Sequence, residues 1–170
     1  MLYYLIALAV FVVDQITKWL IVRNLELGET VPVIGEFFQI TSHRNRGAAF
    51  GILQDQRWFF LVITALVVAG IVYYLNKVRK ESKRLLPFAL SLLLGGALGN
   101  FLDRALTGEV VDFFQLWFRF PLFGKQVDYI YPIFNVADSA IVIGVLLLLI
   151  DSLRSWSQER KEARNESQQS

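Results

Sequence analysis

The sequence predicts an all-α membrane protein with four transmembrane helices and a small extramembrane β-sheet or hairpin region in the first outer loop. Apolar residues make up 55% of its 170 positions. They gather in four runs of about 20 residues, the length of helix that crosses a hydrocarbon core of about 30 Å. Between the first two runs, glycine and proline separate short β-prone segments. A single membrane domain over residues 1–170 accounts for these observations.

The first helix is expected at about residues 2–22. This run lacks the basic start and the small-residue cleavage site of a signal peptide, and it contains Asp14 and Lys18. We therefore expect a retained span rather than a cleaved leader. The first outer loop follows at residues 23–56, and its β-prone runs predict the sheet or hairpin there.

The second and third helices are expected at about residues 57–75 and 85–106. The loop between them, residues 76–84, carries five basic residues and one acidic residue. By the positive-inside rule this loop is cytoplasmic. The direction of all the other spans follows from it.

The fourth helix is expected at about residues 136–153, followed by a polar cytoplasmic tail at 154–170. Both termini are then expected in the cytoplasm. The second outer loop, residues 107–135, is rich in aromatic residues. Since aromatic residues collect at headgroup depth, we expect this loop to lie along the membrane surface.

Composition excludes several classes of site. The chain has no cysteine, which rules out thiolate nucleophiles, disulfides and iron–sulfur clusters. Its one histidine, His43, cannot form the two-histidine motif of a zinc protease. We expect His43 in a loop outside the membrane, which argues against a Ser–His intramembrane protease. The small basic excess indicates membrane orientation, so we expect no nucleic-acid partner. With one histidine and no cysteine, we also expect no metal.

Four aspartates converge on the outer half of the predicted bundle. Asp14 lies roughly 12 Å below the outer end of the first helix, from a rise of about 1.5 Å per residue. Asp103 ends the third helix, Asp138 opens the fourth, and Asp112 lies in the loop between them. Because a charge at the bilayer centre costs about 2.5–3.5 kcal/mol, acids kept near lipid indicate a functional site. Two facing carboxylates would share a proton, the arrangement that activates water for peptide hydrolysis.

Some of these residues also allow simpler explanations. Asp14 and Lys18, spaced i, i+4, form either a local ion pair or a support for the site. Asn135 and Asp138, spaced i, i+3, have the spacing of an N-cap and an acid that satisfy the first turn of the fourth helix.

The third predicted helix combines small and polar residues. Gly95 and Gly99 form a Gly-x-x-x-Gly pair, which indicates close helix packing. A stripe along the same helix, at spacings of i, i+4 and i+7 or i+8, carries Gly96, Asn100, Asp103 and Arg104.

Five ordered blocks of the sequence resemble the lipoprotein signal peptidases (signal peptidase II). The blocks are residues 14–18 (DQITK), 45–50 (NRGAAF), 95–104 (GGALGNFLDR), 110–113 (VVDF) and 134–139 (FNVADS). The resemblance covers most of the chain. It implies an aspartyl endopeptidase of the bacterial cytoplasmic membrane with its active site near the outer leaflet. Such an enzyme removes the signal peptide of a prolipoprotein just before a cysteine that carries a diacylglyceryl group.

The resemblance also implies roles for individual residues. Asp112 and Asp138 match the catalytic dyad. Supporting or substrate-binding positions are matched by Asp14, Lys18, Asn45, Gly47, Gly96, Asn100, Asp103, Arg104 and Asn135. The implied partners are the lipidated prolipoprotein, membrane lipid and peptide inhibitors of the globomycin type, without a cofactor. One departure is visible, since the run 115–131 is longer than expected for the family and carries an added polar patch at 124–128.

Two other functions use some of the same residues. Intramembrane acids also mark the paths of proton- or ion-coupled carriers, although a relay should be distributed across the bilayer rather than clustered on one side. A non-catalytic lipid-binding scaffold would use the aromatic loop and leave the aspartates as helix caps. In a scaffold, Asp-to-Asn substitutions would be nearly silent.

Overall fold

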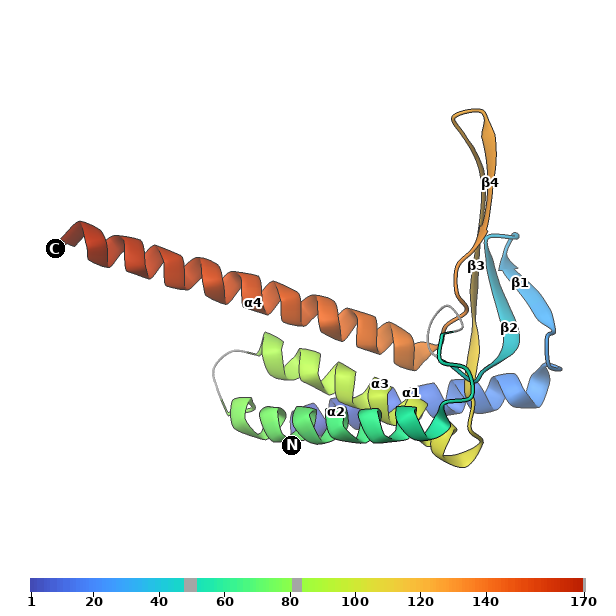
Figure 1. Cartoon of the computed structure of the whole chain (residues 1–170), viewed down its shortest axis with the longest axis horizontal. Helices are drawn as coiled ribbons and strands as arrows, with labels where there is room; N and C mark the ends of the chain where they lie inside the picture. The colour runs from blue at the N-terminus through green and yellow to red at the C-terminus, as the bar shows by residue number, and fades with distance from the viewer. Residues whose placement is uncertain (48–51, 81–83, 170) are drawn as a thin grey trace.

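The computed structural model describes residues 1–47, 52–80 and 84–169 (Figure 1). Four of its helices are long and apolar enough to cross a membrane, which confirms the predicted fold class. They are α1 (Leu2–Asn24), α2 (Arg57–Val78), α3 (Leu85–Leu106) and α4 (Val136–Gln169). Residues 48–50 of the second sequence block and 81–83 of the basic loop lie outside the described residues.

The last helix continues well beyond its apolar part. A polar tail was expected from residue 154, but α4 runs unbroken to Gln169 and projects away from the other helices (Figure 1). The segment contains neither glycine nor proline after Gly144 and is rich in strong helix formers such as Glu, Lys, Arg and Gln. Local propensity therefore carries the helix past the apolar run.

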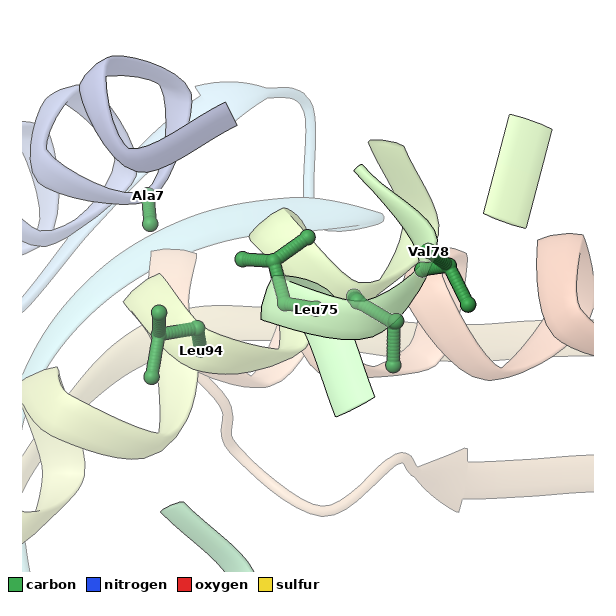
Figure 2. Packing of buried hydrophobic residues seen from close by; sticks show 5 residues of the cluster. Ala7, Leu75, Val78 and Leu94 are labelled. Atoms are coloured by element: carbon green, nitrogen blue, oxygen red, sulfur yellow. The ribbon is translucent and has the colours of Figure 1, made fainter. Parts of the chain in front are cut away.

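The third helix lies at the centre of the bundle and contacts α1, α2 and α4. Half of its most apolar 18-residue window is buried, against 6% of the corresponding window of α2. A small apolar core joins α3 to its neighbours through Ala7, Leu75, Val78, Leu90 and Leu94 (Figure 2). The outward faces of the other helices carry exposed apolar side chains, as expected of surfaces that face lipid.

Glycines let two helices approach α3 closely. A Cβ atom on Gly95 would lie 2.5 Å from the carbonyl oxygen of Ala7 in α1, and one on Gly96 would lie 2.5 Å from that of Ala137 in α4. Gly99 faces the side chain of Asp14 in α1. The close packing predicted for Gly95 and Gly99 is therefore confirmed, with α1 as the partner.

A four-stranded antiparallel sheet stands across one end of the bundle (Figure 1). Its strands, in spatial order, are β1 (Thr30–Ile34), β2 (Phe38–Asn45), β3 (Val110–Leu122) and β4 (Lys125–Ile130). From the sequence, β-structure was expected only in residues 23–56. Residues 107–135 supply the other two strands, because their aromatic and β-branched side chains have high strand propensity as well as an affinity for membrane interfaces.

The third strand brings the two long connecting segments, residues 23–56 and 107–135, and the start of α4 together. It pairs with β2 on one side, and an isolated bridge joins Phe114 to Phe134 just before α4. The β2–β3 register places His43 opposite Asp112. His43 was expected in a loop, but it lies in strand β2.

Candidate active site

The side chain of Asp112 is buried where β3 passes the start of α4. Its Oδ2 accepts a hydrogen bond of 3.0 Å from Nδ2 of Asn45 at the end of β2. Its Oδ1 accepts one of 2.7 Å from Nδ2 of Asn135. Amides from two other segments of the chain therefore fix the orientation of this carboxyl group.

Asp138 lies in the first turn of α4 and has two kinds of partner. Its Oδ2 accepts a hydrogen bond from the backbone N–H of Asn135 at 3.2 Å, and its own N–H donates to Oδ1 of Asn135 at 2.9 Å. This reciprocal pair is a helix cap, as the simpler explanation proposed. The other oxygen, Oδ1, accepts a hydrogen bond of 2.7 Å from Nδ2 of Asn100 in α3. Capping and a place in the site are therefore compatible.

Asn135 and Asn100 connect the two aspartates. Asn135 is fully buried, and its Nδ2 donates to Asp112 at 2.7 Å and to Oδ1 of Asn100 at 3.2 Å. Asn100 in turn donates to Asp138. The two carboxyl groups line one cavity and are joined through shared amides.

Electrostatics near Asp112 favour a shared proton. Burial, and then the negative charge of Asp138, raise the pKa of Asp112 from 3.8 to about 7, against the opposing hydrogen bonds from Asn45 and Asn135. Because two close carboxylates resist ionising together, the pair is expected to hold one proton near neutral pH. The titration belongs to the pair rather than to one member.

Lys18 in α1 lies at the centre of a second buried cluster. Its Nζ lies 2.8 Å from Oδ2 of Asp14 and 2.8 Å from Oδ2 of Asp103. It also donates to Oδ1 of Asn100 at 2.8 Å. The local ion pair of α1 is therefore also tied to α3, and through Asn100 to Asp138.

Asp14 links α1 to the beginning of α4. Its Oδ1 accepts a hydrogen bond of 2.9 Å from the backbone N–H of Ala137, next to Asp138. Gln15 donates to Asp103 at 3.0 Å and to the carbonyl oxygen of Gly99 at 3.3 Å. Gln15 was not singled out from the sequence, although a polar residue inside an apolar run is the signal that identified Asp14.

Arg104 and Gly47 form another contact at the edge of the cavity. Nη2 of Arg104 donates to the carbonyl oxygen of Gly47 at 2.8 Å, and its guanidinium lies 4.6 Å from the ring centroid of Phe60. The N–H of Gly47 donates to Asn45, and a Cβ at Gly47 would lie 2.6 Å from the carbonyl oxygen of Ile52. Glycine is needed here because the chain segments approach too closely for a side chain.

Asp112 and Asp138 line a cavity of about 1050 Å³ between the sheet and α4. Its wall includes Leu116 and Tyr129 from the hairpin and residues 141–143 of α4. Val142 and Ile143 are also exposed on the outside of the bundle. The cavity therefore adjoins the surface of α4 that faces lipid.

Charged and polar residues that the sequence did not assign to the site also line this cavity, among them His43, Arg44, Arg46, Gln54 and Ser139. Arg44 and His43 precede Asn45 on β2, and Ser139 follows Asp138. The strand register that brings the first two there is a long-range property.

The eleven residues predicted for the site occupy one end of the bundle. Ten of them form the hydrogen-bonded groups just described, and Gly96 lies one turn before Asn100 against Ala137. Among the described residues, no group of three or more His, Cys, Asp or Glu side chains is placed to hold a metal ion. What the site offers chemically is a pair of carboxyl groups with amide and guanidinium donors around them.

Comparisons with known proteins give a consistent result. A family model described as signal peptidase (SPase) II matches residues 6–154. The chain is 52% identical over 162 residues to the lipoprotein signal peptidase of Bacillus subtilis, covering 95% of this chain and 99% of that relative. It is 57% identical over 153 residues to that of Bacillus pumilus, covering 90% and 93%. A solved structure described as a bacterial membrane enzyme matches with a TM-score of 0.79 at 44% identity, covering 92% of this chain and 90% of that one.

Proposed function

Since the chain belongs to the signal peptidase II family and is a multi-pass bacterial membrane peptidase, we propose that Asp112 and Asp138 are its catalytic dyad. In this proposal the enzyme cleaves a prolipoprotein on the N-terminal side of a diacylglyceryl-modified cysteine. The observation that carries it is the pair of carboxyl groups in one cavity, that of Asp112 buried and that of Asp138 partly buried, held by amides of Asn135 and Asn100.

The proposed chemistry uses one proton on the pair. The ionised carboxylate takes a proton from water as the water oxygen attacks the scissile carbonyl carbon, while the protonated carboxyl donates to the carbonyl oxygen. The tetrahedral intermediate then collapses, the C–N bond breaks, and the dyad returns a proton to the leaving nitrogen. No covalent enzyme intermediate forms. The raised pKa of Asp112, about 7, supports a dyad that keeps this proton near neutral pH.

Arg104 is the proposed donor to the substrate backbone or to the developing oxyanion. It lines the cavity, and its Nε is buried without a hydrogen-bond partner among the described residues. A fixed cation close to a charge that develops only during reaction stabilises the transition state more than the ground state. Its bond to Gly47 and its contact with Phe60 hold the guanidinium in place.

The position of the cavity supports a lipid-modified substrate. Residues 141–143 of α4 line it, and Val142 and Ile143 are exposed toward the surroundings of the bundle. The peptide occupies the cavity in this proposal, while the diacylglyceryl chains stay in the bilayer beside α4. A peptide inhibitor of the globomycin type would compete for the same cavity.

The proposed orientation puts the sheet end of the bundle outside the cell. The loop between α2 and α3 lies at the other end (Figure 1). The described basic residues of this loop and of the last turn of α2 are Lys77, Arg79, Lys80 and Arg84. The positive-inside rule supports a cytoplasmic position for that end, with both termini there and the dyad near the outer leaflet.

The test is a gel-shift assay of purified protein in detergent micelles, with a diacylglyceryl-modified prolipoprotein as substrate. The same prolipoprotein without lipid and the Asp138→Asn variant run beside it. We expect cleavage of the lipidated substrate alone, and none with the variant. Cleavage by folded Asp138→Asn protein would contradict the dyad. If the wild-type protein cuts neither substrate, proton-flux assays in liposomes would test the carrier alternative.

A further inference from the structure

The β3–β4 hairpin has two chemically different faces. Its strands pair without a register shift from Trp117↔Ile130 to Leu122↔Lys125. Because successive side chains of a strand point to opposite faces, the register sorts them. One face carries Phe118, Phe120, Leu122, Lys125, Val127 and Tyr129. The other carries Trp117, Arg119, Pro121, Gln126, Asp128 and Ile130.

The second face carries a cluster of polar contacts, although Ile130 at its base is 48% exposed. Arg119 pairs with Asp128 at 3.5 Å and stacks 3.7 Å from the ring centroid of Trp117. The indole Nε1 of Trp117 donates to Asp128 at 2.6 Å. On the first face, the apolar side chains of Phe120 and Leu122 near the tip are exposed. The hairpin is therefore an amphipathic ribbon, with an apolar face that is open.

The apolar face is the side of β3 that carries Asp112. Asp112, Leu116, Phe118, Phe120 and Leu122 are separated by even numbers of residues along one strand. Asp112 and Leu116 line the cavity together with residues 141–143 of α4. This side of the strand therefore turns toward a helix that spans the membrane.

The hairpin stands across the helix axes and extends past the side of the bundle (Figure 1). A segment that crosses the axes of membrane-spanning helices at their end runs along the membrane surface. Its face toward α4 is then also its face toward lipid. It continues the apolar surface formed by exposed residues such as Val142 and Ile143 of α4.

The turn at the tip gives an independent indication. Phe123 and Gly124 join β3 to β4 with φ angles of +48° and +75°. Asn-Gly or Asp-Gly is favoured in such two-residue turns, and a bulky side chain at positive φ is strained. Phe123 is nevertheless 97% exposed, so contacts with the rest of the chain do not offset this strain. Its ring would be buried by lipid at the headgroup level, where aromatic residues are enriched.

We propose that the tip of the β3–β4 hairpin is a lipid anchor. Phe120, Leu122 and Phe123 enter the boundary between headgroups and acyl chains, and Lys125 contacts anionic headgroups. The anchor keeps the hairpin wall of the cavity against the bilayer surface. It depends on the membrane-spanning fold and not on the proposed aspartyl chemistry.

The absence of cysteine from the chain allows single-cysteine labelling of the full-length protein. Spin labels at Leu122→Cys and Phe123→Cys are compared with a label at Gln126→Cys, a matched control near the tip on the opposite face. The proteins are reconstituted in liposomes of phosphatidylethanolamine and phosphatidylglycerol. Power saturation then measures the accessibility of each label to oxygen, which partitions into lipid, and to a water-soluble nickel chelate.

We expect a severalfold higher ratio of oxygen to nickel accessibility at positions 122 and 123 than at 126. Equal ratios at the three positions, or a higher ratio at 126, would overturn the anchor. Dipolar broadening between labels at 123 that disappears on dilution with unlabelled protein would show a second copy of the chain on this face, which would also overturn it.

The role of Lys125 has its own test. Replacing phosphatidylglycerol by phosphatidylcholine should reduce the depth of the label at 123, and Lys125→Glu should remove this dependence on the headgroup. A headgroup dependence that persists in Lys125→Glu would contradict the cationic contact. Since every readout is a label depth, these results are distinct from any result on peptide cleavage.

Discussion

Nδ2 of Asn135 donates a hydrogen bond of 2.7 Å to Oδ1 of Asp112. Asn135 also caps α4, because its Oδ1 accepts the N–H of Asp138 at 2.9 Å. One buried side chain therefore begins the helix that carries one aspartate and holds the strand aspartate in place. The geometry of the pair depends on a residue that need not take part in proton transfer.

Replacing Asn135 by serine should separate its two tasks. Serine is also a good N-cap, but its short hydroxyl cannot hold Asp112. We expect Asn135→Ala to be less stable than Asn135→Ser by about 1 kcal/mol, because alanine offers no cap to α4. Cleavage should fall about 10- to 100-fold in Asn135→Ser, since misplaced catalytic groups cost rate. Thermal unfolding in detergent and kcat/KM measure the two effects, and full activity in Asn135→Ser would refute the positioning role.

Removing either carboxylate should abolish cleavage without unfolding the protein. Asp112→Asn and Asp138→Asn each leave the pair unable to exchange a proton, so kcat should fall by about 10³-fold or more, within the range typical of acid–base catalysis. Single-turnover cleavage of lipidated prolipoprotein is the measurement. Asp151→Asn, a substitution of the same type further along α4, should keep wild-type activity. Comparable losses in all three variants would point to a general effect of charge.

The buried carboxyl of Asp112 should make stability depend on pH. Its pKa rises from 3.8 to about 7 on folding, so between these values the folded state binds more protons than the unfolded state. Stability is therefore expected to fall as pH rises through this window. Asp112→Asn removes the effect, and its advantage in unfolding free energy should grow by on the order of 2–4 kcal/mol between pH 4 and pH 8. Melting temperatures of both proteins across this range would test it, and a constant difference would argue against the raised pKa.

The four spans could be predicted from the sequence because the length of an apolar run is a local property. Half of the sheet could not. The aromatic residues from Phe113 to Tyr131 have the composition of a membrane-surface segment and of strands alike. Only pairing partners distant in the chain, such as Ile40 for Phe114, separate the two possibilities.

It was easier to predict which residues belong to the site than which of them contact one another. Aspartates beside apolar runs are conspicuous, helical spacing singled out Asn100 and Asn135, and the family resemblance added Asn45. The bond from Asn45 to Asp112 depends on a β2–β3 register that contains an irregularity between Ile40 and His43. Such a shift reverses which side chains face the cavity and has no sequence signal of its own.

Lys18 should be essential for stability because it neutralises two buried acids. Lys18→Met leaves Asp14 and Asp103 without their cation, and breaking a buried ion pair in this way costs about 3–5 kcal/mol. The double variant Lys18→Met/Asp14→Asn should recover part of the loss, since one uncompensated charge is removed. Chemical unfolding in detergent measures both. A double variant less stable than Lys18→Met alone would mean that packing, rather than charge, sets the cost.

Gly96 should control the position of Asp138 through helix packing. A methyl group there would lie 2.5 Å from the carbonyl oxygen of Ala137, so α4 must shift at the turn that carries the aspartate. Overpacking of this kind typically costs about 1–3 kcal/mol, and a displacement of about 1 Å can reduce the rate about 100-fold. The matched control is Gly70→Ala in α2, where a Cβ would meet nothing within 4 Å. It should be neutral or stabilise by up to about 1 kcal/mol. Cleavage rates and melting temperatures are measured for both variants. Equal effects in the two would mean that the loss of a glycine, and not contact with α4, is responsible.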